Sequence, residues 1–187
     1  LPQIIAAPLT ALFLLAVTNA INLSDGLDGL AGGTTFLCCV AIALLSFGTE
    51  LAFVSTMAVV VMGALLGFLR YNSFPAQVFM GDGGSQFLGF TVGVLAVMLT
   101  QDEALPYSAA LPLLLLGLPI LDTLTVMAIR LREGRSPFSA DRKHLHHRLI
   151  GLGFEHFESV GVIYLLQGAL FLLAWQLRFH SDVTIVA

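Results

Sequence analysis

The chain has 187 residues, of which 57% are hydrophobic and 11% are charged, and its formal net charge is −4. Soluble globular domains contain about 45–50% apolar and roughly 25% charged residues, so this composition excludes an ordinary soluble enzyme. A mean hydropathy of +0.92 instead predicts an all-α fold, a polytopic bundle of membrane helices.

Apolar segments broken by glycine, proline and charge predict about six transmembrane helices. In chain order they cover residues 3–21, 31–47, 51–70, 84–100, 106–131 and 158–178. The connections then alternate between the two sides of the membrane, so 22–30, 71–83 and 132–157 lie on one face. We expect residues 1–187 to form a single integral-membrane domain.

Most basic residues lie on one face of this predicted bundle. Six of the eight are in or beside the connection 132–157, namely Arg130, Arg132, Arg135, Arg142, Lys143 and Arg148. Because cytoplasmic loops carry the excess of Lys and Arg, this face is predicted to be cytoplasmic. The three polar connections are therefore predicted to meet on the cytoplasmic side.

The first polar connection lies within NAINLSDGLDGLAGG, residues 19–33, which has two acids three positions apart. A spacing of three places Asn19, Asn22, Asp25 and Asp28 along one side of a helical turn. An ionised side chain at membrane depth costs roughly 2.5–3.5 kcal/mol, so such residues usually face a cavity and serve a function. The alternative is a solvated loop in which Asn and Asp only cap helices.

The second connection begins the segment YNSFPAQVFMGDGGSQFLG, residues 71–89, in which Asp82 lies among glycines just before a long apolar helix. Free backbone N–H groups at a helix start can hold an anion, and a carboxylate can hold a divalent cation. The pattern predicts a junction of metal and phosphate. A helix cap formed by Asp82 or Ser85 is the alternative.

Most of the third connection belongs to the segment RLREGRSPFSADRKHLHHRLIGLGF, residues 130–154. As a helix it would place His144, His147 and Arg148 on one face with His146 pointing elsewhere, whereas in a loop all four could converge. Cations and imidazoles suit a diphosphate, whose oxygens accept charge-assisted hydrogen bonds. A basic loop that only sets membrane topology is the alternative reading.

Asp122 lies inside the fifth predicted span and is expected to face the bundle interior. A structural hydrogen bond between helices is as good an explanation for it as a catalytic role. Pro119, three residues earlier, is expected to open the helix and leave a carbonyl without its helical partner.

Taken in order, the segments NAINLSDGLDGLAGG, FMGDGGS, PILDT and PFSADRKHLHHRL resemble the polyprenyl-phosphate N-acetylhexosamine-1-phosphate transferases, glycosyltransferase family 4. The resemblance covers nearly the whole chain. It is strongest to the bacterial branch that moves N-acetylglucosamine-1-phosphate from UDP-N-acetylglucosamine to undecaprenyl phosphate, because of the Asp-Arg-x-His-x-His-His pattern. Such enzymes release UMP and serve cell-envelope polysaccharide synthesis.

The resemblance also implies cofactors, partners and a location. It implies dependence on Mg²⁺, with Mn²⁺ as the alternative ion, in the bacterial inner membrane with the active site on the cytoplasmic face. The implied partners are a UDP-N-acetylhexosamine, undecaprenyl phosphate and membrane lipid. No nucleic acid is expected, and a homodimer is left open.

Residue roles follow from the resemblance where the motifs match. The residues that resemble the catalytic positions are Asp82, which is also the metal ligand, Arg142, His146 and His147. The residues that resemble substrate-binding positions are Asn22, Asp25, Gly26, Leu27, Asp28, Asn72, Phe79 and His144.

One motif of the family is missing. Its members carry an adjacent Asp-Asp pair on an earlier cytoplasmic loop, and this chain contains no Asp-Asp pair. We therefore interpret the chain as the C-terminal portion of a longer protein, and its activity alone is in question. The alternatives are a phospho-N-acetylmuramoyl-pentapeptide transferase, a non-catalytic fragment, and an ion-coupled transporter whose acids line a pathway.

Overall fold

The computed structural model describes residues 3–101, 107–137, 139 and 143–186, and all regular structure in these ranges is helical. The all-α prediction is thereby confirmed. The helices are α1 (Gln3–Leu23), α2 (Leu30–Ser46), α3 (Ala52–Asn72), α4 (Gly81–Leu99), α5 (Leu111–Leu115), α6 (Gly117–Arg132), α7 (Leu145–Gly151), α8 (His156–Leu177) and α9 (Asp182–Val186).

Four helices in the described ranges, α1, α3, α4 and α8, are long and apolar enough to cross a membrane, and α2 is a shorter apolar helix of 17 residues. Each of these five lies within three residues of a predicted span. Large apolar side chains such as Leu12, Phe53, Leu165 and Leu172 are exposed on their outer faces. A surface of this kind is suited to lipid, so the chain forms a helical membrane bundle.

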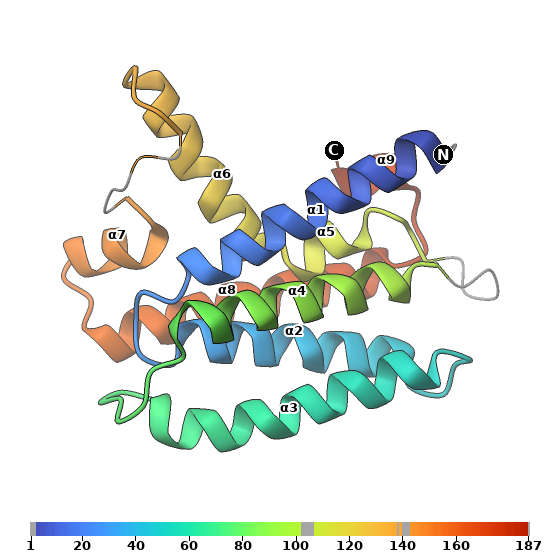
Figure 1. Cartoon of the computed structure of the whole chain (residues 1–187), viewed down its shortest axis with the longest axis horizontal. Coiled ribbons are helices and arrows are strands. Elements are labelled where there is room, and N and C mark those ends of the chain that lie inside the picture. The colour runs from blue at the N-terminus through green and yellow to red at the C-terminus, as the bar shows by residue number, and fades with distance from the viewer. Residues whose placement is uncertain (1–2, 102–106, 138, 140–142, 187) are drawn as a thin grey trace.

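The bundle is built from pairs of neighbouring helices (Figure 1). Helix α1 packs against α4, α2 packs against α3, and α8 also lies against α2. The close approach of α1 and α4 depends on two glycines four residues apart on α4, because a Cβ at Gly89 would lie 2.8 Å from Thr18 Cα and one at Gly93 would lie 3.1 Å from Leu14 Cδ2. Small residues at this spacing let membrane helices approach closely.

The fifth predicted span, 106–131, is wrong as one helix. Residue 106 lies outside the described residues, and the rest forms two helices, α5 and α6, that meet at Leu116. Pro119 has no N–H to donate to the carbonyl of Leu115, as a continuous helix would require. That carbonyl instead accepts from Gln167 Nε2 at 2.9 Å and from Cys38 Sγ at 3.2 Å. The prediction that Pro119 opens the helix is therefore confirmed, but the carbonyl that it releases is not free.

Beyond this break, α6 leaves the bundle and projects away from it, while α7 lies between α6 and the start of α8 (Figure 1). The α1–α2 connection, the α3–α4 connection and α7 lie at one end of the molecule, and α9 lies at the other end. The alternation of connections along the chain predicted that the three polar segments lie on one side of the membrane. In the structure these segments do meet at one end. We call this end the polar end.

Candidate active site

The first segment of the polar end is a tight turn rather than an extension of α1. Helix α1 ends at Leu23, and Gly29, with a φ of 79°, starts α2. A φ in this range is the left-handed conformation that glycine adopts without strain. The expectation that four polar residues follow one side of a helical turn is therefore wrong, and Asn19 bonds back to the carbonyl of Leu15 at 2.7 Å.

The turn brings the first two motifs into contact. Asn22 Nδ2 donates to Asp82 Oδ1 at 3.3 Å and to Ser85 Oγ at 2.9 Å. Partial burial, and after it the negative charge of Asp82, raises the pKa of the Asp25 carboxyl above its usual range. The Asn22 bond thus joins Asp82 to the end of α1, next to Asp25, and the charge of Asp82 disfavours ionisation of the Asp25 carboxyl.

This carboxylate pair fits a divalent cation. In the described residues no group of three or more His, Cys, Asp or Glu side chains is arranged to hold a metal ion. Mg²⁺, however, is commonly held by one or two carboxylates together with substrate phosphates and water. Asp25 and Asp82 could provide two such oxygen ligands, and a cation between them would offset the effect of one negative charge on the other.

Two other predicted site residues of the first two segments, Asp28 and Asn72, hold the loops together. Asp28 Oδ2 accepts the N–H of Ala76 at 2.9 Å. Asn72 is buried; its Oδ1 accepts the N–H of Gly29 at 3.1 Å and its Nδ2 donates to the carbonyl of Val78 at 2.9 Å. Asp28 and Asn72 therefore fix the shape of the turn that carries Asp25.

His156, which sequence reasoning missed, completes this arrangement. Its Nε2 accepts the N–H of Asp28 at 3.1 Å, and its ring stacks on Phe74 with centroids 5.0 Å apart. The acceptor role requires an unprotonated Nε2. Its position at the start of an apolar helix on the polar side could have indicated a site residue, but no recognisable motif surrounds it.

The histidine segment, His144–Arg148, combines features of both predicted forms. Helix α7 starts at Leu145, and His144 precedes it in extended conformation. The three imidazoles lie in a row, with centroids 5.9 Å apart for His144 and His146 and 4.2 Å for His146 and His147. His144 and His146 are buried, while His147 is partly exposed and Arg148 is exposed.

His146 contacts the first segment directly. A Cβ added to Gly26 would lie 2.4 Å from His146 Nε2, so only glycine leaves room for the ring here. Burial, and after it the charges of His147 and His144, lowers the pKa of His146 from 6.5 to about 4. The imidazole is therefore neutral at pH 7, and it can act through hydrogen bonds but not as a cation.

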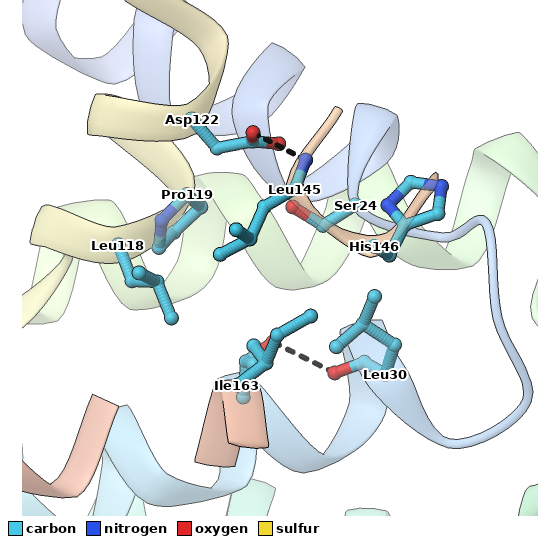
Figure 2. Close-up of a pocket in the computed structure, with 9 residues that line it drawn as sticks. Ser24, Leu30, Leu118, Pro119, Asp122, Leu145, His146 and Ile163 are labelled. Atoms are coloured by element: carbon cyan, nitrogen blue, oxygen red, sulfur yellow. Dashed lines mark hydrogen bonds between the residues drawn. The ribbon is translucent and has the colours of Figure 1, made fainter. Parts of the chain in front are cut away.

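A small pocket of about 20 Å³ lies beside this contact (Figure 2). It is enclosed by the turn, α2, α6, α7 and α8, and Asp122 and His146 border it. The lining residues are Ser24, Leu30, Thr34, Leu118, Pro119, Asp122, Leu145, His146 and Ile163. This volume admits about one water molecule and no substrate.

The remaining predicted site residues have different surroundings. Phe79 lies on the α3–α4 connection with 74% of its surface exposed, so its ring is accessible to a ligand. Leu27 is buried in a small apolar cluster with Leu30 and Leu149. Asp82 is exposed. Arg142 lies outside the described residues.

We expect the neutral state of His146 to make the protein sensitive to acid. Since its pKa is lower in the folded protein than the ordinary 6.5, stability is complete above pH 6.5 and declines as the pH falls from 6.5 towards about 4. Thermal unfolding in detergent across this interval should show a smaller decline for His146→Gln. The exposed His180 provides a control, and an equal effect of His180→Gln would contradict the assignment.

The turn also depends on Tyr164 of α8, whose hydroxyl donates to the carbonyl of Gly29 at 2.6 Å. A Cβ at Gly33 would lie 1.8 Å from this hydroxyl. We therefore expect Gly33→Ala to lower the free energy of unfolding by about 1–3 kcal/mol through overpacking. Gly168→Ala is the matched control, because no atom lies within 4 Å of that Cβ. Equal melting temperatures for the two variants would refute this expectation.

Residues 1–100 match the family described as Glycosyl transferase family 4. The chain is 43% identical to a probable undecaprenyl-phosphate N-acetylglucosaminyl 1-phosphate transferase of Bacillus subtilis, over 86% of this chain and 45% of that protein.

Two further relatives are similar. An undecaprenyl-phosphate alpha-N-acetylglucosaminyl 1-phosphate transferase of Escherichia coli is 35% identical over 78% of this chain and 41% of its own length. A phospho-N-acetylmuramoyl-pentapeptide-transferase of Clostridium beijerinckii is 36% identical over 79% of this chain and 44% of its own length. The chain thus spans about half the length of the curated relatives that it matches.

Proposed function

Because the chain belongs to glycosyl transferase family 4, we propose that the full-length protein transfers N-acetylglucosamine-1-phosphate from a UDP-sugar to undecaprenyl phosphate and releases UMP. The names of the Bacillus and Escherichia relatives support this lipid and this sugar. A donor that carries N-acetylmuramoyl-pentapeptide is the second candidate, which the Clostridium relative supports.

The observation that carries the proposal is the hydrogen bond from Asn22, beside the turn that holds Asp25, to Asp82 at the start of α4. The turn that holds Asp25 also contacts the histidine segment through Gly26 and His146. Acidic groups for a cation and a basic segment for phosphate therefore lie side by side, as phosphoryl transfer between two anionic substrates requires.

In the proposed reaction an oxygen of the lipid phosphate attacks the β-phosphorus of the UDP-sugar. The bond between that phosphorus and the bridging oxygen breaks, its electron pair leaves with UMP, and the product is a lipid diphosphate sugar. A divalent cation, Mg²⁺ or alternatively Mn²⁺, would be held by Asp25 and Asp82 and would neutralise charge on the diphosphate.

The basic residues would bind the phosphate oxygens. Arg148 and His147 are accessible at the polar end and can donate hydrogen bonds to them. We propose the same role for Arg142. His146 is neutral at pH 7, so its proposed role is a hydrogen bond at the edge of the site and not the donation of a positive charge.

We also propose how the nucleotide binds. Phe79 is exposed beside Asp82 in the sequence and would stack on the uracil ring. Asp28 and Asn72 are already engaged with backbone groups, so they would act by shaping the turn around the nucleotide. The excess of basic residues in and beside the connection 132–157 of the sequence supports a cytoplasmic active site in the bacterial inner membrane.

The full-length protein, reconstituted with undecaprenyl phosphate, tests the proposal. UMP should be released from UDP-N-acetylglucosamine in a lipid-dependent and cation-dependent manner. Faster UMP release from the muramoyl-pentapeptide donor would favour the second candidate. Ion flux through proteoliposomes without any UMP release would overturn the proposal in favour of a transporter.

A further inference from the structure

Asp122 of α6 makes two contacts, both with the histidine segment. Its Oδ2 lies 2.8 Å from His144 Nδ1, and its Oδ1 accepts the N–H of Leu145 at 2.7 Å. The side chains of Asp122 and His144 are only 14% and 7% exposed. Figure 2 shows the carboxylate directed at Leu145 across the edge of the small pocket. The pair is therefore largely shielded from substrate and solvent.

The chemistry of the carboxylate determines the state of the His144 ring. An ionised carboxylate only accepts hydrogen bonds, so the proton in this contact is on His144 Nδ1. Hydrogen bonds to an ionised partner are short and about twice as strong as neutral ones. Asp122 thus holds His144 in one orientation and with Nδ1 protonated.

The contact extends from α6 to the carboxylate pair. The His144 ring stacks on His146 with an interplanar angle of 7°. His146 in turn lies against Gly26, the neighbour of Asp25. A displacement of His144 would therefore move the imidazole row relative to the turn that carries Asp25.

We propose that Asp122 is a positioning residue for the transfer reaction, which acts through His144 to hold the histidine segment against the Asp25 turn. This inference rests on the proposed function. In this arrangement His144 anchors the segment through the hydrogen bond of its Nδ1 to Asp122. His147 and Arg148, further along the segment, would then bind the diphosphate.

Two replacements of His144 separate this role from direct contact with substrate. Asparagine places an N–H donor near the position of Nδ1, and glutamine reaches the position of Nε2. An anchor needs the donor towards Asp122, so His144→Asn should retain more activity than His144→Gln. If His144 Nε2 instead binds substrate, the order is reversed, and that result would overturn the inference.

Asp122→Asn tests the other partner with little change in volume. Its oxygen can still accept from Leu145, but its amide donates towards His144 Nδ1 and forces the other tautomer. We expect kcat of the full-length protein to fall about a hundredfold with little change in KM, because misplaced groups act mainly on the chemical step. Thr125→Val, at an exposed position of the same helix, is the control.

Hydrogen exchange tests the contact without reference to activity. In Asp122→Ala the amides of α7 should lose protection, whereas Thr125→Val should leave them unchanged. If the wild-type protein releases no UMP, the proposed function is refuted. The exchange measurement then still shows whether Asp122 holds α7 in place. Normal kcat in Asp122→Asn, or unchanged exchange in Asp122→Ala, would overturn the inference.

Discussion

Asp82→Ala in the full-length protein is expected to lower cation-dependent UMP release by roughly a thousandfold, the loss seen when a charge-stabilising group is removed from an active site. Asp82 bonds to Asn22 and repels Asp25, so its removal takes away one of two candidate cation ligands. The remaining carboxylate should then titrate closer to the ordinary range of an aspartate, because its pKa is no longer raised by the charge of Asp82.

A carboxylate at the opposite end of the molecule provides the control. Asp182 bonds to the N–H of Ala110 at 3.2 Å and lies in α9. Asp182→Asn should leave the rate of UMP release near that of the wild type. A second readout is the melting temperature, which Mg²⁺ should raise for wild type and much less for Asp82→Ala. Near-normal turnover of Asp82→Ala would remove Asp82 from the site.

The positions of the long helices could be predicted because hydrophobic length depends on local sequence alone. The break between α5 and α6 could be predicted only in part. Pro119 indicated a free carbonyl, which is that of Leu115. The donors that bond to this carbonyl, Cys38 and Gln167, are 77 and 52 residues away from Leu115 in the sequence. Hydropathy does not report which distant side chain compensates a broken helix, so the two short helices appeared as one span.

The different surroundings of Asp25 and Asp28 in the candidate site could likewise not be predicted from the local sequence. Asp25 and Asp28 are three residues apart, and that spacing predicts a shared direction only if the helix continues. The helix ends at Leu23, and the turn directs Asp25 to Asp82 but Asp28 to the backbone of Ala76. The meeting of the polar segments could be predicted from the alternation of connections across the membrane. The different roles of Asp25 and Asp28 could be seen only once the shape of the turn was known.

The link between Asp122 and His144 could not be predicted either. Asp122 was recognised inside the fifth predicted span and His144 in the connection that follows it, but their pairing depends on α6 leaving the bundle and on α7 folding back. A tertiary contact of this kind carries no periodic signal in the sequence. The same holds for His156 and the N–H of Asp28.

Gly26→Ala should be the other replacement with a large effect, because the turn and the histidine segment touch at this residue. The new Cβ would lie 2.4 Å from Nε2 and 2.8 Å from Cε1 of His146. His146 is 3% exposed and its ring lies between the imidazoles of His144 and His147, so it has little room to move aside. We expect the free energy of unfolding to fall by about 1–3 kcal/mol and turnover to fall about a hundredfold.

Two comparisons separate the clash from a general effect of alanine. Gly151→Ala adds the same methyl group to α7 where no atom lies within 4 Å, so its stability and turnover should match the wild type. In the double variant Gly26→Ala with His146→Ala the clash disappears, and stability should recover while turnover stays low because the imidazole is gone. If Gly26→Ala alone keeps wild-type turnover, the contact between these two segments is not required for the reaction.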